Sequence, residues 1–297
     1  MSNKKSLKVV FVVILIALPL RLWAFSVEPP RHPRIGEIKG SPPILELELK
    51  SFKHQYLLRE PIWVKLKVTN IGEEAGSFYF TSVDGLKIED SKGDEYPCRI
   101  HIDRLPIAIN PGEVLQKEFN LLMYYGLPEN KYKIHWHLPP EKYSIRYEIN
   151  QTVRSETYRV EARSETYTFR IIEPKGDDLK AMNLLKEAYD LQVLKKDESY
   201  KDKLKELLRE YPDSRYYVYA LLMSADSLDD WYDLIQRFPD SREAVRAVRS
   251  IALTFEKKKD KKGYTEAMNE LIEKYPNTDI SKEAEKQLKN MKEENFK

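Results

Sequence analysis

Apolar and polar residues alternate with a period of two between residues 44 and 174. At the start of this stretch, in ILELELK, Leu45, Leu47 and Leu49 share one face and glutamates occupy the other. The same alternation returns at 61–70, 142–150 and 165–174. Strands that bury one face against a core produce this pattern. Because glycine-containing turns join the segments and none of them is helical, the pattern predicts an antiparallel β-sandwich over 44–174.

Beyond residue 176 the apolar period changes to 3.6, which indicates α-helices. Apolar residues recur at helical spacing in 177–196, 200–212, 227–239 and 263–276. Asp177 and Asp178 open the first of these segments, where the positive end of a helix favours acidic side chains. The change of period predicts a domain boundary, followed by an all-α domain over 177–293.

Three of the predicted helices end in the same short sequence: YPDS at 211–214, FPDS at 238–241 and YPNT at 275–278. Proline stops a helix because it lacks the N–H donor and clashes with the preceding turn. The polar residues after it supply an oxygen that can cap the next helix. The three prolines are separated by 27 and 37 residues. This spacing predicts repeated helical hairpins.

The form of the repeat, aromatic-Pro-Asp-Ser before an alanine-rich helix, resembles that of tetratricopeptide proteins of the bacterial cell envelope. The resemblance spans residues 178–293, and 238–276 is similar to one complete unit. Two departures are the 27-residue interval, shorter than the usual ~34 residues, and the missing Trp-Leu-Gly signature. The resemblance implies stacked helical hairpins that hold other proteins.

The strands resemble the immunoglobulin-like domains of exported bacterial proteins. The residues that carry this resemblance are REPIWVKLKVTNIG, NPGEVLQKEFNLLMYYG and LPPEKYSIRYEI, within residues 44–174. The expected fold class is therefore multidomain α+β: an N-terminal antiparallel immunoglobulin-like β-sandwich followed by C-terminal, all-α, tetratricopeptide-like repeats.

The N-terminal segment predicts export. Residues 1–24 combine a basic start, an apolar run of 12 residues at 9–20, and Ala24 at a plausible cleavage point. The run is shorter than the ~20 residues of a spanning helix, which favours a signal peptide over an uncleaved anchor. Residues 25–43 are rich in proline and predict a linker. We expect a periplasmic location, or one on the outer side of the cytoplasmic membrane, with membrane contact only through an uncleaved leader.

Charge and cysteine content narrow the partner class. Outside the leader there are 46 basic and 48 acidic residues, which is not the footprint of a nucleic-acid binder. Cys98 is the only cysteine, so no disulfide can form within the chain. We expect a protein or peptide partner, no nucleic acid and no cofactor.

Five residues are the candidate partner-binding set. Arg242, Arg246 and Arg249 follow one another at helical spacing and form a basic stripe, and Tyr216 and Tyr219 lie on the preceding hairpin. Arginine and tyrosine are favoured at interfaces. The hypothesis is a clamp for an acidic or C-terminal peptide segment, and the alternative is a solvated face with packing between repeats.

No motif indicates catalysis, so we expect a protein that is not an enzyme, with no catalytic and no metal-binding residues. A metal-dependent enzyme using His135 and His137 is a weaker alternative, since only Cys98, His101 and Glu141 offer further ligands and no spacing rule joins them. A second alternative is a binding module that resembles immunoglobulin-fold proteinase inhibitors and presents the loop 123–133.

Overall fold

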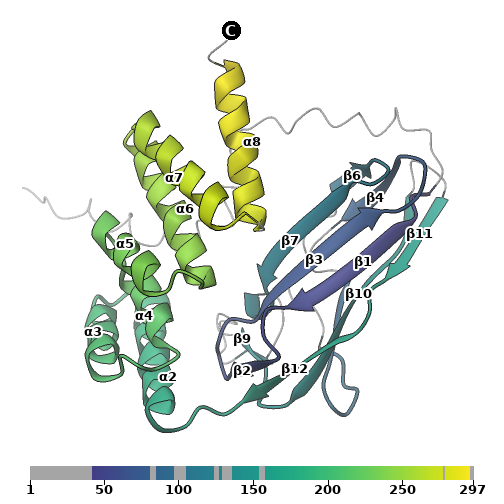
Figure 1. Cartoon of the computed structure of the whole chain (residues 1–297). Helices are drawn as coiled ribbons and strands as arrows, with labels where there is room; N and C mark the ends of the chain where they lie inside the picture. Colours follow the sequence, from purple (N-terminus) through teal and green to yellow (C-terminus); the bar gives the residue numbers. More distant parts are fainter. Residues whose placement is uncertain are drawn as a thin grey trace, which may run out of the picture.

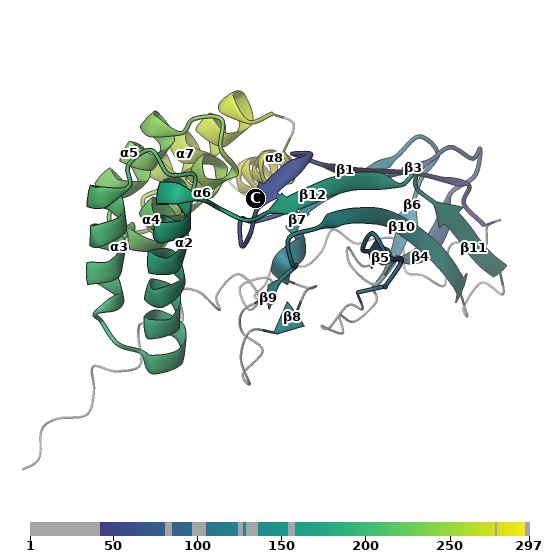
Figure 2. The same cartoon turned by 90° about the horizontal axis from the view of Figure 1, so that it is seen from below.

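The computed structural model describes residues 42–80, 85–96, 105–123, 127–128, 136–153, 158–276 and 278–294. Its strands lie between residues 45 and 172, here called the β region, and its helices between 176 and 294, here called the helical region. Figures 1 and 2 show the two regions side by side, in contact along one flank. The predicted leader and almost all of the predicted linker lie outside the described residues. Among the described helices, none is long and apolar enough to cross a membrane.

The β region contains two larger sheets, in which β3 and β10 are flanked by strands on both sides. The first has the order β1 (Leu45–Ser51), β3 (Trp63–Asn70), β7 (Val114–Asn120). The second has the order β11 (Tyr158–Arg163), β10 (Lys142–Val153), β12 (Tyr167–Ile172), β2 (Gln55–Leu57), with β5 (Leu86–Glu89) also on β10. Two small pairs complete the region: β4 (Gly76–Phe80) with β6 (Leu105–Ile109), and β8 (Leu127–Pro128) with β9 (Trp136–His137). A short 3₁₀ turn, Leu121–Met123, follows β7.

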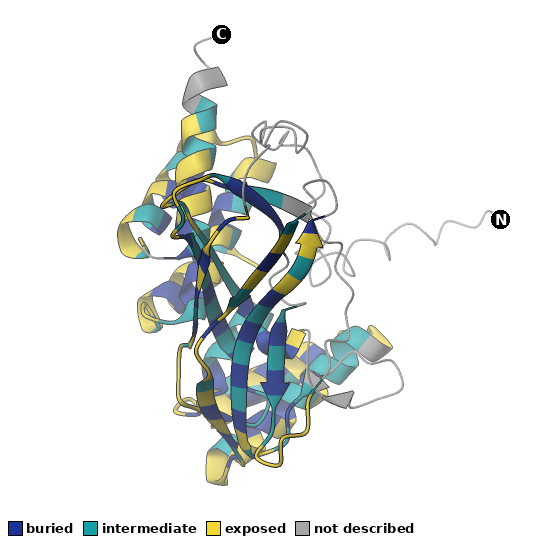
Figure 3. Cartoon of the chain, turned by 90° about the vertical axis from the view of Figure 1, so that its right-hand side faces the viewer, coloured by how far each residue is buried: buried dark blue, intermediate teal, exposed yellow. Residues whose placement is uncertain are grey.

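The predicted alternation fixes which face of each strand is buried. In β3, Val64, Leu66 and Val68 are fully buried, whereas the residues between them are half-exposed. Figure 3 shows the same banding along the neighbouring strands. Apart from Leu57 of β2, the buried apolar residues of the larger sheets belong to one cluster, so the sheets share a core. The described antiparallel sheets agree with the predicted strand character, while the immunoglobulin-like assignment is taken up below as a proposal.

One pair departs from the antiparallel expectation. Strand β2 runs parallel to β12, with Gln55 opposite Arg170 and Leu57 opposite Ile172. The reason is that the chain leaves the first sheet after β1 and crosses to the second, where it arrives in the direction of β12. Periodicity reports which face of a strand is buried but not its direction, so the sequence could not reveal this pair.

The helical region is a run of helices packed against their neighbours in sequence. The helices are α2 (Gly176–Tyr189), α3 (Tyr200–Glu210), α4 (Tyr217–Ser224), α5 (Leu228–Arg237), α6 (Arg242–Lys257), α7 (Lys261–Lys274) and α8 (Asp279–Glu294). A π-helical turn, Asp190–Lys195, continues α2 and was not predicted. The helices α6 and α7 approach closely at Gly263, where a Cβ atom would stand 2.6 Å from the Phe255 ring. With any side chain at position 263, the Phe255 ring would have to move.

The repeated sequence YPDS, FPDS, YPNT is a repeated structure. Tyr211, Phe238 and Tyr275 end their helices with nearly the same backbone angles, φ of −131°, −132° and −129° and ψ of 56°, 54° and 49°. The predicted caps are present at two of the three sites. The Ser241 Oγ accepts the N–H of Ala244 at 3.0 Å, and the Thr278 Oγ1 accepts the N–H of Ser281 at 3.0 Å.

The third cap is different. The Ser214 hydroxyl donates to the Asp178 carboxylate of α2 at 2.8 Å, and α4 begins three residues later without a side-chain cap. The polar residue at this position joins two helices of the stack instead of capping the next one. Local sequence could not distinguish the two uses, because both need a hydroxyl at the same place.

We expect Ser241→Ala to lower the free energy of unfolding of the helical region by about 1 kcal/mol, the usual loss for a helix N-cap. Ser199→Ala is the matched control, because Ser199 also precedes a helix but its side chain makes no cap hydrogen bond. Urea unfolding followed by circular dichroism measures both. Equal losses in the two variants would contradict the capping role of Ser241.

Candidate functional site at the junction of the two regions

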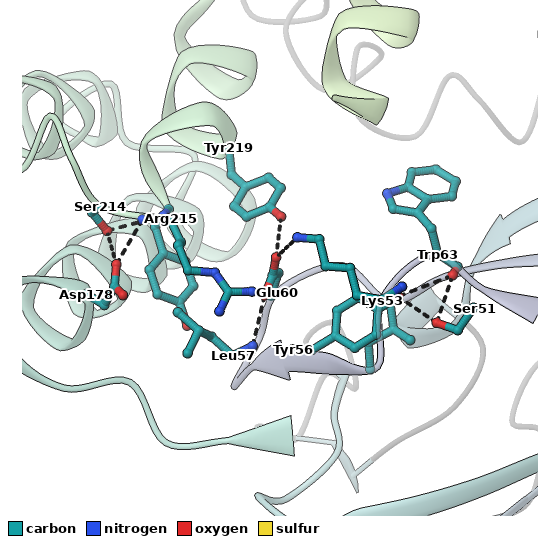
Figure 4. A network of polar contacts seen from close by, with 12 residues as sticks. Ser51, Lys53, Tyr56, Leu57, Glu60, Trp63, Asp178, Ser214, Arg215 and Tyr219 are labelled. Carbon is teal, nitrogen blue, oxygen red and sulfur yellow. Dashed lines mark hydrogen bonds and ion pairs between the residues drawn. The ribbon is translucent and has the colours of Figure 1, made fainter. Parts of the chain in front are cut away.

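The junction centres on Glu60, a carboxylate that is 2% exposed. Its Oε2 accepts the N–H of Leu57 at 2.8 Å and a guanidinium N–H of Arg215 at 2.6 Å. Its Oε1 accepts the ammonium of Lys53 and the hydroxyl of Tyr219, the latter at 3.2 Å. Figure 4 shows these donors converging on the carboxylate from both regions. A buried carboxylate needs such compensation, because removing it from water costs several kcal/mol.

The loop between β2 and β3 carries Glu60 to the helices. A turn closes where the N–H of Glu60 donates to the carbonyl of Leu57 at 3.0 Å, with Arg59 in the left-handed region at φ +70°. The Tyr216 hydroxyl donates to the carbonyl of Leu58 on this turn. Leu57 itself is buried in the apolar cluster formed by α2, α3 and α4. Two apolar side chains, Leu57 and Leu58, and several polar contacts therefore hold the turn against the helices.

A second contact joins β7 to α6 and α8. Arg242, at the start of α6, forms an ion pair with the Glu118 carboxylate of β7 and stacks over the Phe52 ring at 4.1 Å from its centroid. The backbone N–H of Glu118 donates to Asp279, the first residue of α8, at 3.3 Å. Lys282 of α8 donates to Gln116 at 3.2 Å. The starts of α4, α6 and α8 thus all contact the β region.

Burial shifts the pKa of several groups at the junction. Burial raises the pKa of Glu118, and the opposing charge of Arg242 only partly offsets this. Burial likewise raises the pKa of Glu243 on α6, which is 4% exposed and whose Oε1 has no hydrogen-bond partner among the described residues. The pKa of Tyr219 is also raised, first by burial and then by the negative charge of Glu60. At Glu118 and Glu243 the nearby cations therefore do not fully offset the cost of burying the carboxylate charge.

The structure separates the five predicted partner-binding residues. Tyr216 is fully buried against the β2–β3 turn, Tyr219 is half-buried against Glu60, and Arg242 pairs with Glu118. Three of the five therefore contact the chain's own β region, and partner binding by the set stays a prediction. Arg246 and Arg249 are exposed on α6, and their role in binding stays a prediction.

Nothing in the sequence marks Glu60, Glu118 or Asp178 as buried. Each is an acidic residue directly after another charged residue, which is typical of an exposed position. Their partners, Arg215, Arg242 and Ser214, lie far away in the chain, so only the tertiary fold brings them together. Leu57 offered the only hint, since an apolar residue at the end of a short strand has to be covered by something.

The other candidate sites fall mostly outside the described residues. Cys98, His101 and His135 lie there, as does nearly all of the loop 123–133. His137 is half-buried in β9. Within the described part of the chain, no group of three or more His, Cys, Asp or Glu side chains is placed to hold a metal ion.

A cleft of about 1030 Å³ opens beside the Glu60 network, where the ends of β10 and β12 meet the starts of α2 and α4. It is lined by Leu57, Ser91, Pro140, Glu141, Lys142, Arg170, Ile171, Ile172, Glu173, Lys175, Asp178 and Arg215. Both regions contribute to its walls, so the docking of the regions creates it.

The sequence model of the tetratricopeptide repeat family matches residues 250–278, which cover the second half of α6, all of α7 and the turn before α8. The match overlaps the unit that the sequence predicted over 238–276, from residue 250 to residue 276. The helical region therefore contains a tetratricopeptide-like repeat. Repeats of this kind generally mediate interactions between proteins.

No curated protein matches the chain. Similar solved structures include a β-glucosidase from Erythrobacter marinus, with 16% identity over 44% of this chain and 16% of that chain and a TM-score of 0.27. A β-glucosidase from Listeria innocua has 14% identity over 44% of this chain and 16% of that chain, with a TM-score of 0.25. The sporulation control protein Spo0M from Bacillus subtilis has 12% identity over 48% of this chain and 55% of that chain, with a TM-score of 0.24. The match thus spans about a sixth of each glucosidase. TM-scores this low carry no argument about activity.

We expect Glu60→Gln to lower the free energy of unfolding by roughly 3 kcal/mol, because Lys53 and Arg215 lose their buried counter-charge while the side-chain shape is kept. Glu48→Gln is the control, since Glu48 also pairs with two cations but on the exposed face of β1, where such pairs contribute about 1 kcal/mol at most. Urea unfolding of both variants measures the difference. Comparable losses would show that the Glu60 network does not hold the junction.

We expect Glu243 to make stability depend on pH. A carboxyl whose pKa is raised in the folded state binds its proton more tightly there, so the folded state gains stability as pH falls from above that raised pKa towards the ordinary value of 4.5. Glu243→Gln removes this gain. The stability of the original chain relative to the variant should therefore rise on acidification from roughly pH 8 to pH 5. Urea midpoints that differ by a constant amount across this range would contradict the assignment.

Proposed function

We propose that this chain is an exported, non-enzymatic protein of the cell envelope that binds another protein or peptide through its helical repeats. The observation that carries the proposal is the tetratricopeptide-like repeat at 250–278 inside a continuous stack of helical hairpins. Stacked hairpins offer an extended surface without a catalytic centre of their own. The β region, which on its resemblance is an immunoglobulin-like sandwich, supports this stack through the Glu60 and Glu118 contacts.

The proposed binding surface is the exposed part of α6. Arg246 and Arg249 point away from the apolar side of that helix, where Val245 and Val248 are buried. Since Arg242 is held by Glu118, the basic stripe begins beside the junction and continues into solvent along α6. An acidic or C-terminal segment of the partner suits the Arg249 guanidinium best, because burial around the Arg246 guanidinium lowers its pKa and Glu243 already supplies it with a negative charge.

Export is proposed from the leader. A basic start, a 12-residue apolar run and Ala24 are the parts of a secretory signal. A chain with one cysteine also depends on ordinary packing for its stability, and the apolar cores of both regions supply that packing.

A membrane-impermeant crosslinker applied to intact cells tests location and partner together. We expect the chain to be crosslinked to a discrete protein, and Arg246→Glu with Arg249→Glu to reduce the yield about tenfold, because the repulsion replaces two favourable charge contacts. Lys258→Glu with Lys261→Glu is the control, since it makes the same charge change at exposed positions just after α6 and at the start of α7.

Two results would contradict the proposal. Crosslinking only after the cells are opened would argue against export. Equal loss of the crosslink in both double variants would show that overall charge matters and that the α6 surface does not.

A further inference from the structure

The cleft between the regions combines an apolar floor with a charged rim. Ile172 and Pro140 offer apolar surface, whereas Leu57 and Ile171, which are 5% and 3% exposed, are packed mainly into the cores of the helical and β regions. Charged side chains of β10, β12 and the segments before α2 and α4 surround them. A floor of this kind accepts an apolar side chain, while the rim selects for the charge beside it.

Two cations of the rim face each other without compensation. Lys142 of β10 lies directly opposite Arg170 of β12, and both are exposed. Like charges directly opposite across strands are destabilising. Elsewhere on the same strand the chain neutralises its charge, since Arg146 is bonded to both Glu89 and Glu148. Within the described part of the chain, neither Lys142 nor Arg170 has an ion-pair partner.

Two further cations extend the rim on the helical side. Lys175 precedes α2 and is exposed, and Arg215 precedes α4 with 39% of its side chain exposed even though it bonds Glu60. Of the three carboxylates in the lining, two are already engaged: Asp178 accepts the N–H of Arg215 at 2.8 Å and Glu141 accepts the hydroxyl of Ser91. The lining thus holds four cations and three carboxylates, and the two cations that lie opposite each other on β10 and β12 are the ones that an acidic ligand would compensate.

We propose that this cleft binds an extended segment of a partner protein in which acidic side chains flank an apolar one. The apolar residue packs on Ile172 and Pro140, and the acidic residues meet Lys142, Arg170 and Lys175. The proposal rests on the proposed function as an interaction protein and adds a second surface, separate from Arg246 and Arg249. A nucleic acid is disfavoured because the chain outside its leader has more acidic than basic residues.

Fluorescence anisotropy with the full-length chain tests the cleft. The probe is a labelled Glu-Leu-Glu-Leu-Glu-Glu peptide, and the comparison peptide has glutamine in place of every glutamate. We expect saturable binding of the acidic peptide, weakened by added salt, and binding at least about tenfold weaker for the glutamine peptide. Lys142→Glu with Arg170→Glu should weaken the acidic peptide by a similar factor, while Lys258→Glu with Lys261→Glu should leave it unchanged.

Several outcomes would overturn the proposal. These are no saturable binding of the acidic peptide, equal binding of the glutamine peptide, equal loss in the two double variants, or tighter binding of a short single-stranded RNA than of the peptide. Circular dichroism of both variants shows that a loss of binding is not a loss of fold.

The crosslinking experiment separates this inference from the proposed function. In one outcome, the double variant Lys142→Glu with Arg170→Glu is crosslinked to the partner as well as the original chain is, and the acidic peptide does not bind. The cleft inference then fails while the proposed function stands. If the original chain captures no partner at all, the proposed function fails, whatever the peptide does.

Discussion

The relative position of the two regions depends on the burial of one carboxylate. Glu60 is removed from water at the junction, and an isolated charge there would be strongly destabilising. The donors that compensate it are divided between the regions: Lys53 and the Leu57 N–H come from the strands, and Arg215 and Tyr219 come from the helical side. The compensation is complete only when the regions are docked in this orientation. The network therefore selects an orientation as well as joining two surfaces.

The repeated helix ends make this docking possible. Each aromatic-proline turn stops one helix and starts the next, so α4, α6 and α8 all begin on the same side of the stack. That side meets the β region through Tyr216, Arg242 and Asp279. Tyr216 directly precedes α4, and Arg242 and Asp279 are the first residues of α6 and α8. In an isolated array of repeats, the aromatic-proline turns would only set the spacing of the helices. In this chain they also align three contacts to the β region along one flank.

This arrangement has a consequence for binding. Part of the surface that helical repeats usually offer to a partner is occupied by the chain's own β2–β3 turn. Two charged surfaces that this docking leaves open are the outer part of α6, with Arg246 and Arg249, and the cleft around Lys142 and Arg170. The cleft exists because the regions dock, so any loss of the Glu60 network would alter it as well as the stability of the junction.

The sequence by itself determined the local structure. The period of two identified the strands, the period of 3.6 identified the helices, and proline followed by serine or threonine marked the helix ends, because these signals depend on residues only a few positions apart. Tertiary structure alone decided the parallel pairing of β2, the burial of Tyr216 and the role of Glu60. The Glu60 and Arg215 side chains that meet at the junction are 155 residues apart in the chain. No local pattern records whether a charged side chain will find such a partner, and so exposed and buried acids look alike until the chain is folded.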